Sequence, residues 1–74
     1  MAEPETETLS VGDRPINLTQ VLKLAGWALT GGEAKTLIAD GRVKVNGEQE
    51  LRKRRQMVLG DSVQLEDGPT LVLG

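Results

Sequence analysis

The chain has 74 residues, contains neither cysteine nor histidine, and carries a formal net charge of −2. A domain of this length buries a thin core and has no room for a deep catalytic cavity, which argues against an enzyme. The missing residue types exclude disulfides, thiolate chemistry and the usual zinc sites, so we expect no catalytic residue, no cofactor and no metal.

The charges are segregated along the chain. Residues 1–13 carry four acidic side chains and no basic one, whereas residues 14–58 carry all nine Lys and Arg against four acids, a local charge of 9 − 4 = +5. The last sixteen residues add three more acids. A basic middle between two acidic ends indicates a polyanionic partner.

Neither a membrane span nor a signal peptide is visible. No stretch approaches the roughly 18 uninterrupted apolar residues of a span, and the N-terminus lacks the basic and then apolar order of a signal peptide. We therefore expect a cytoplasmic protein that does not enter a membrane, and we expect it to be a monomer.

Residues 1–13 alternate acids with Thr, Ser and Pro and have almost no apolar content. Such a segment cannot offset the entropy lost on ordering, so we predict a disordered acidic tail followed by a folded domain over residues 14–74. The tail would aid solubility, or its acids would compete weakly with a polyanion for the basic surface.

Two signals predict that a helix covers residues 18–25. Asn17 and Gln20 have the spacing of a capping box, and Ile16 and Val21 occupy the two positions of a hydrophobic staple. These signals are independent of each other, and both place the start of the helix at the same point.

A second capping box, Thr30 with Glu33, opens a helix that we expect to run to about Asp40. Its apolar residues recur at the i, i+3, i+4, i+7 spacing of one buried helix face: Ala34, Leu37, Ile38 and Gly41. Trp27, the only aromatic residue, lies between the two helices. It would either pack under the loop or stack on a base.

Residues 43–45 alternate as a half-buried strand, and Asn46-Gly47 is a strong hairpin signal. A two-residue loop would place Glu48 and Glu50 opposite the buried valines. A three-residue loop with a glycine bulge instead pairs Val43 with Leu51 and the lysine of the strand with Glu50, and we predict this bulged form.

Three further apolar stretches complete the chain: residues 57–59, 63–65 and 71–73, separated by Gly-Asp and Asp-Gly-Pro turns. The sequence therefore predicts an α+β fold in which two short helices pack on a small antiparallel sheet.

The run Arg52-Lys53-Arg54-Arg55 is either a solvated loop or a binding site. Four adjacent like charges repel one another, so without a counter-anion they destabilise a small domain. We predict that they join cations of the preceding elements in one basic surface that suits a phosphate backbone, made of Lys35, Arg42, Lys44, Arg52, Lys53, Arg54 and Arg55.

The missing aromatics narrow the choice of nucleic acid. Single-strand readers stack bases on aromatic platforms, and this chain has no Phe, no Tyr and one Trp. Recognition of folded or double-stranded RNA needs only well-placed cations and helix N-termini. The backbone at Gly31 and Gly32, at the start of the second helix, could approach a phosphate.

The segment from Ile16 to Asp61 resembles the αL RNA-binding domain of the ribosomal protein S-four type, in particular its small stand-alone, bacterial YbcJ-like members. The resemblance is carried by TGGEAKTLIADGRVKVNG, the four-cation run and the closing LGD. It implies two helices packed on a small sheet, with RNA held by the start of the second helix and by the turns and loop that follow.

Within this resemblance, Lys35 matches a basic position of the second helix and Arg42 a polar or basic position just past it. Asn46-Gly47 matches the hairpin turn, and residues 52–55 fall in a variable, often basic loop. The chain departs from many members at Gly31, where they carry an arginine.

We therefore predict a non-catalytic protein that binds structured RNA, of the ribosomal or transfer RNA class. The alternative is a protein-interaction module that docks an acidic partner within an RNA-processing or ribosome-associated complex. A hydrolase would need a carboxylate dyad in a pocket, whereas Asp40, Glu48 and Glu50 are expected to be surface acids.

Overall fold

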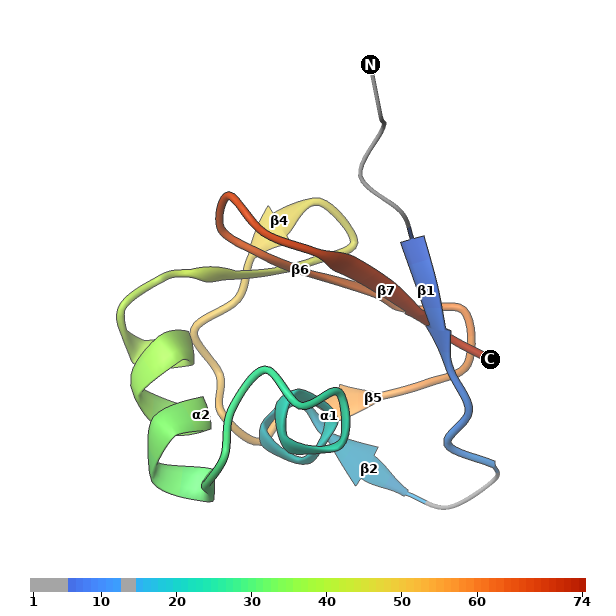
Figure 1. The fold of residues 1–74 in the computed structure, drawn as a ribbon, viewed down its shortest axis with the longest axis horizontal. Coiled ribbons are helices and arrows are strands. Elements are labelled where there is room, and N and C mark those ends of the chain that lie inside the picture. The colour runs from blue at the N-terminus through green and yellow to red at the C-terminus, as the bar shows by residue number, and fades with distance from the viewer. Residues whose placement is uncertain (1–5, 13–14) are drawn as a thin grey trace.

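The computed structural model describes residues 6–12 and 15–74 (Figure 1). Two helices and seven strands lie within these ranges. In chain order they are β1 (Thr6–Leu9), β2 (Ile16–Asn17), α1 (Leu18–Leu24), α2 (Gly31–Ala39), β3 (Val43–Val45), β4 (Glu48–Gln49), β5 (Gln56–Met57), β6 (Ser62–Leu65) and β7 (Thr70–Leu73). Neither helix in the described part of the chain is long and apolar enough to cross a membrane.

Five strands form one sheet in the order β1-β7-β6-β3-β4, and β2 pairs with β5 in a separate two-stranded ladder. Both helices lie on the same side of the large sheet (Figure 1). This arrangement confirms the expected α+β fold with two helices on a small sheet. The sheet is mixed, however, because β1 runs parallel to β7 while the other pairs are antiparallel.

The core lies between the helices and the sheet. Strand alternation directs Val43 and Val45 into it and leaves Lys44 exposed on the opposite face. Trp27 is half-buried and packs against this core, as expected if it is a packing residue. The largest fully buried side chains come from both layers: Leu18, Val21, Leu22, Ile38, Val43, Val63, Leu71 and Leu73.

The capping box of α1 is confirmed. The Asn17 side chain accepts from the Gln20 amide at 3.0 Å, and the Gln20 side chain accepts from the Asn17 amide at 2.9 Å. At the start of α2, Thr30 Oγ accepts from the Glu33 amide at 3.1 Å, but the Glu33 carboxylate accepts from the Leu29 amide at 2.7 Å. Both helices begin where the sequence places them and end one residue earlier than expected.

The predicted three-residue hairpin loop with a glycine bulge is wrong. Val45 lies opposite Glu48, so Asn46 and Gly47 alone form the loop. Both residues have positive φ, 52° and 85°, as the favoured two-residue hairpin turn requires. The bulged loop was predicted because a two-residue loop places the Glu50 carboxylate on the apolar face, where an unpaired charge is unfavourable. In the structure two arginines bind this carboxylate, so its burial is no longer unfavourable.

The prediction of a disordered tail is wrong for residues 6–12. Strand β1 pairs with β7 over Thr6–Leu9, and Val11 is only 5% exposed in the core. Although the segment is mostly polar, its two apolar side chains, Leu9 and Val11, contact the core. Its Thr residues also favour a strand. Residues 1–5 and 13 of the expected tail, and residue 14 of the expected domain, lie outside the described residues.

Val11→Ala should therefore destabilise the domain by about 1.5 kcal/mol, since two buried methyl groups are lost. Urea unfolding of the full chain measures this. The control is Leu29→Ala, because Leu29 is 85% exposed and its truncation should change the free energy of unfolding by less than about 0.5 kcal/mol. Equal stability of Val11→Ala and the wild type would show that this segment does not pack in solution.

Candidate nucleic-acid interface

The basic run forms a tight turn between β4 and β5. The Arg55 amide donates to the Arg52 carbonyl at 3.3 Å, which closes a four-residue turn with Lys53 and Arg54 at its tip. An open hollow beside the turn is lined by Gln56 and by three of these cations. The loop thus presents its two central residues outward.

The backbone of the same turn caps α1. The Leu18 amide donates to the Arg55 carbonyl at 3.0 Å, and the Thr19 amide donates to the Lys53 carbonyl at 3.3 Å. Thr19 Oγ donates to the same Lys53 carbonyl at 2.8 Å. The first amides of a helix have no partner within the helix, so these carbonyls satisfy them and fix the loop against α1.

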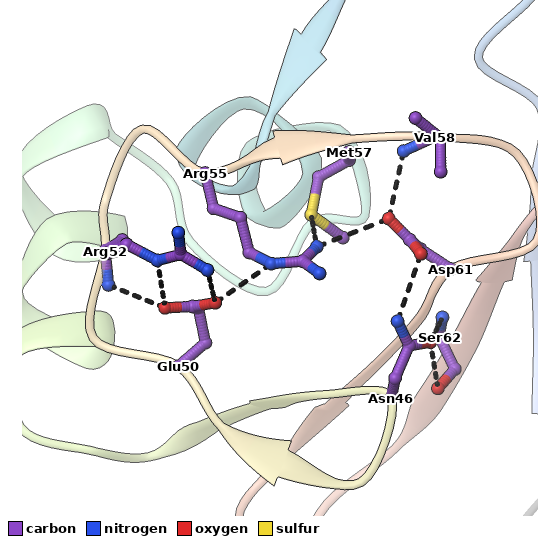
Figure 2. Close-up of polar contacts among 8 residues, drawn as sticks. All are labelled: Asn46, Glu50, Arg52, Arg55, Met57, Val58, Asp61 and Ser62. Atoms are coloured by element: carbon purple, nitrogen blue, oxygen red, sulfur yellow. Dashed lines mark hydrogen bonds and ion pairs between the residues drawn. The ribbon is translucent and has the colours of Figure 1, made fainter.

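Glu50 holds the two ends of the turn (Figure 2). Its carboxylate binds Arg52 through two contacts of 3.0 Å, from Nε and Nη2, and accepts from Arg55 Nε at 2.9 Å. The hydrogen bonds from the Arg52 side chain outweigh burial, and they lower the pKa of Glu50 from 4.5 to about 2. Glu50 is therefore ionised throughout the neutral range.

Asp61 connects this turn to the hairpin (Figure 2). It accepts from Asn46 Nδ2 at 3.0 Å, from the Val58 amide at 3.0 Å and from Arg55 Nη1 at 3.3 Å. Asn46 in turn accepts from the Ser62 amide at 2.9 Å. Burial by itself would raise the pKa of Asp61, but the hydrogen bonds and the charge of Arg55 together lower it below 3.8.

The four cations of the run thus differ in their surroundings. Arg52 and Arg55 are paired with carboxylates, and the Arg55 side chain is only 25% exposed. Lys53 and Arg54 are exposed, and no carboxylate in the described ranges pairs with either. We call Glu50, Arg52, Arg55 and Asp61 the carboxylate network, and Lys53 and Arg54 the exposed pair.

Lys35 and Arg42 are both exposed, Lys35 on α2 and Arg42 in the link from α2 to β3. The amides of Gly31 and Gly32, at the start of α2, have no acceptor within the part of the chain that the structure describes. Added Cβ atoms at these glycines would meet no closer neighbour than Thr30 Oγ at 3.7 Å, so the backbone there is open to an approaching group.

The expected basic surface is not a single patch, because Lys44 lies apart from the loop. Strand alternation turns Lys44 away from the helices, onto the outer face of the sheet. The hollow on that face is also lined by three carboxylates, from Glu7, Glu66 and Asp67. Lys44 therefore lies in acidic surroundings that do not favour a polyanion.

Sequence reasoning did not identify the two acids that organise the loop. Glu50 was expected to be a surface acid, and Asp61 only a turn residue. A signal was nevertheless present, because Glu50 lies two and five residues before the arginines that it binds. Among the described residues, no cluster of three or more acidic side chains could hold a metal ion.

The two-helix, mixed-sheet arrangement defines a small α+β module of the αL type, and comparison with known proteins gives its family. The model of the S4 domain matches residues 9–73 of the chain. This protein therefore belongs to the S4 domain family.

Two similar proteins differ in the function that their names express. The "Putative RNA-binding protein YbcJ" of Escherichia coli (strain K12) is 47% identical over 57 residues, which cover 76% of this chain and 81% of that protein. The "Probable ribosome maturation protein RlbA" of Bacillus subtilis (strain 168) is 38% identical over 66 residues, covering 89% and 87%.

A solved structure supports the fold assignment. The solution structure of Escherichia coli YbcJ, described as revealing an αL motif involved in RNA binding, superposes with a TM-score of 0.71 at 38% identity. The match covers 99% of this chain and 92% of that one. The expected resemblance to the αL domain and its YbcJ-like members is thereby confirmed.

Proposed function

We propose that this protein is a non-catalytic RNA-binding protein that recognises structured RNA of the ribosomal or transfer RNA class. It acts in the cytoplasm as a monomer. The observation that carries this function is the exposed pair, Lys53 and Arg54, at the tip of a turn whose backbone is fixed against α1. The description of YbcJ as involved in RNA binding, and the ribosomal role in the name of RlbA, support the same function.

The exposed pair binds neighbouring phosphates of the RNA backbone. Their ammonium and guanidinium groups are free to make charge-assisted hydrogen bonds, which are stronger than neutral ones. Lys35 on α2 and Arg42 in the link that follows it extend the contact, and the open amides of Gly31 and Gly32 offer two more donors to a phosphate. Arg52 offers phosphate the exposed part of its guanidinium, and Arg55 shapes the loop.

Recognition of folded RNA follows from the surface that is available. Trp27 is half-buried in the core, and the sequence has no other aromatic residue. Stacking on unpaired bases is therefore a minor contribution, and the contacts read the shape and backbone of the RNA. Such a mode tolerates changes of base sequence but depends on the fold of the RNA.

The salt dependence of RNA binding tests this function. A folded ribosomal RNA hairpin and a single-stranded oligonucleotide of equal length are titrated with protein at several salt concentrations. Log affinity for the hairpin should fall linearly with log salt. Each neutralised phosphate should contribute about 0.7 to 0.9 to the slope of this line, so a few phosphate contacts should give a slope of about two to five. No binding, a flat salt dependence, or tighter binding of the single strand would contradict the proposal.

A second candidate function is docking onto an acidic protein partner within a ribosome-associated or RNA-processing complex. It is favoured by three exposed apolar side chains that flank the segment from the loop to β5: Leu51 directly before the basic run, and Val58 and Leu59 directly after β5, which are 55%, 64% and 55% exposed. Exposed apolar patches rimmed by polar residues are typical of protein-interaction sites. Alanine at these positions would then weaken partner binding, while leaving the affinity for the RNA hairpin unchanged.

A further inference from the structure

Glu50 is a carboxylate beside a surface proposed to bind a polyanion. Simple electrostatics makes this position unfavourable, because a negative charge repels phosphate. Its side chain is nevertheless only 12% exposed, enclosed between Arg52, which is 74% exposed, and Arg55. A structural role of Glu50 must offset the repulsion.

The geometry of the turn identifies this role. Arg52 and Arg55 are the first and fourth residues of the turn, and Glu50 binds both of their side chains (Figure 2). The two residues between them are Lys53 and Arg54. Glu50 therefore holds the ends of the turn on one side, while the carbonyls of Lys53 and Arg55 hold it against α1.

We infer that Glu50 is a positioning residue for RNA binding: it neutralises and joins Arg52 and Arg55, so that the turn presents the exposed pair to adjacent phosphates. This inference rests on the proposed RNA-binding function. Without Glu50, four consecutive cations repel one another and the side chains of Arg52 and Arg55 are no longer joined, although the backbone of the turn keeps its contacts with α1. RNA binding must then order the loop, and that entropy cost lowers the affinity.

The expected sign is opposite to that of simple charge attraction. Glu50→Gln makes the protein more positive by one charge, yet it should weaken binding of the RNA hairpin about three- to tenfold, because loop side chains must be immobilised on binding. The matched control is Glu48→Gln. Glu48 is exposed on β4 and makes no ion pair among the described residues, so this variant should bind as well as the wild type or up to about twofold tighter.

A charge-conserving variant separates position from charge. Glu50→Asp keeps the negative charge but is one methylene shorter, so it cannot reach both arginines as Glu50 does. It should weaken RNA binding about two- to threefold, because the loop side chains are then partly disordered in the free protein and must be ordered when RNA binds. Nuclear magnetic resonance provides an independent readout, since the Arg55 Nε–H that donates to Glu50 should exchange slowly with water in the wild type and rapidly in Glu50→Gln.

The outcomes distinguish this inference from the function on which it rests. A wild type without salt-dependent RNA binding overturns the proposed function. A wild type that binds RNA, together with a folded Glu50→Gln variant that binds equally or more tightly, overturns the role of Glu50 alone. If Glu50→Gln does not fold, Glu50→Asp decides the question, and wild-type affinity in that variant overturns the inference.

Discussion

Replacing Lys53 and Arg54 together by glutamine should weaken binding of the RNA hairpin by about 2 kcal/mol, or roughly thirtyfold, because two charge-assisted contacts to phosphate are lost. The slope of log affinity against log salt should become shallower by about 1.5, close to 0.7 to 0.9 for each lost contact. Both side chains are exposed and unpaired with any described carboxylate, so the stability of the domain should change little.

The control for this variant removes two positive charges elsewhere. Lys23 is exposed in the last turn of α1, and Lys44 lies on the outer face of the sheet. The double variant Lys23→Gln with Lys44→Gln should weaken RNA binding by no more than about threefold, because only the net charge of the protein changes. If the control weakens binding as much as the first variant, the interaction depends on net charge and the basic loop has no special role.

Asp61→Ala should have the largest effect on stability, a loss of about 3 kcal/mol, because it leaves buried donors without an acceptor. Asp61 is 8% exposed and accepts hydrogen bonds from Asn46, Val58 and Arg55. For a domain of this size the melting temperature should fall by on the order of 15 °C, which calorimetry measures. The control Asp40→Ala changes an exposed acid at the end of α2 and should leave the melting temperature within a few degrees.

The pH dependence of unfolding gives a second measurement. Glu50 and Asp61 both have a lowered pKa in the folded protein. Their ionised forms therefore stabilise the fold fully when the pH is above their pKa values in the unfolded chain, 4.5 for Glu50 and 3.8 for Asp61. This stabilisation is lost as the pH falls, and for Glu50 the loss extends down to about pH 2. As the pH falls below about 3.8, Asp61→Ala should therefore lose less stability than the wild type, and parallel pH profiles would contradict this.

The helix starts were predictable because the physical signals that set them are local. The Asn17 and Thr30 caps act on amides three residues away, and the structure contains both hydrogen bonds. The turn at Asn46-Gly47 was also located correctly. Its loop length was not, because the choice depended on the surroundings of Glu50, which are set by arginines of the following loop.

The N-terminal strand shows a different limit of sequence reasoning. Residues 6–9 resemble a solvated tail in composition, and their order arises from pairing with β7, more than sixty residues later in the chain. No local signal reports such a partner. The edge position of β1 tolerates its exposed polar side chains, so neither apolar content nor alternation indicated a strand.

The amino-acid sequence alone determined the two helices, the hairpin turn and the concentration of positive charge in the middle of the chain, because capping, periodicity and composition act between near neighbours. Only the tertiary structure decided which cations remain available to bind phosphate. The turn between β5 and β6 brought Asp61 to Arg55 and, across the fold, to Asn46, and the pairing of β3 with β6 placed Lys44 beside acidic residues. The fold of the basic loop placed Glu50 between two arginines. Charge interactions depend on distance in space and on burial, and neither can be obtained from positions along the chain.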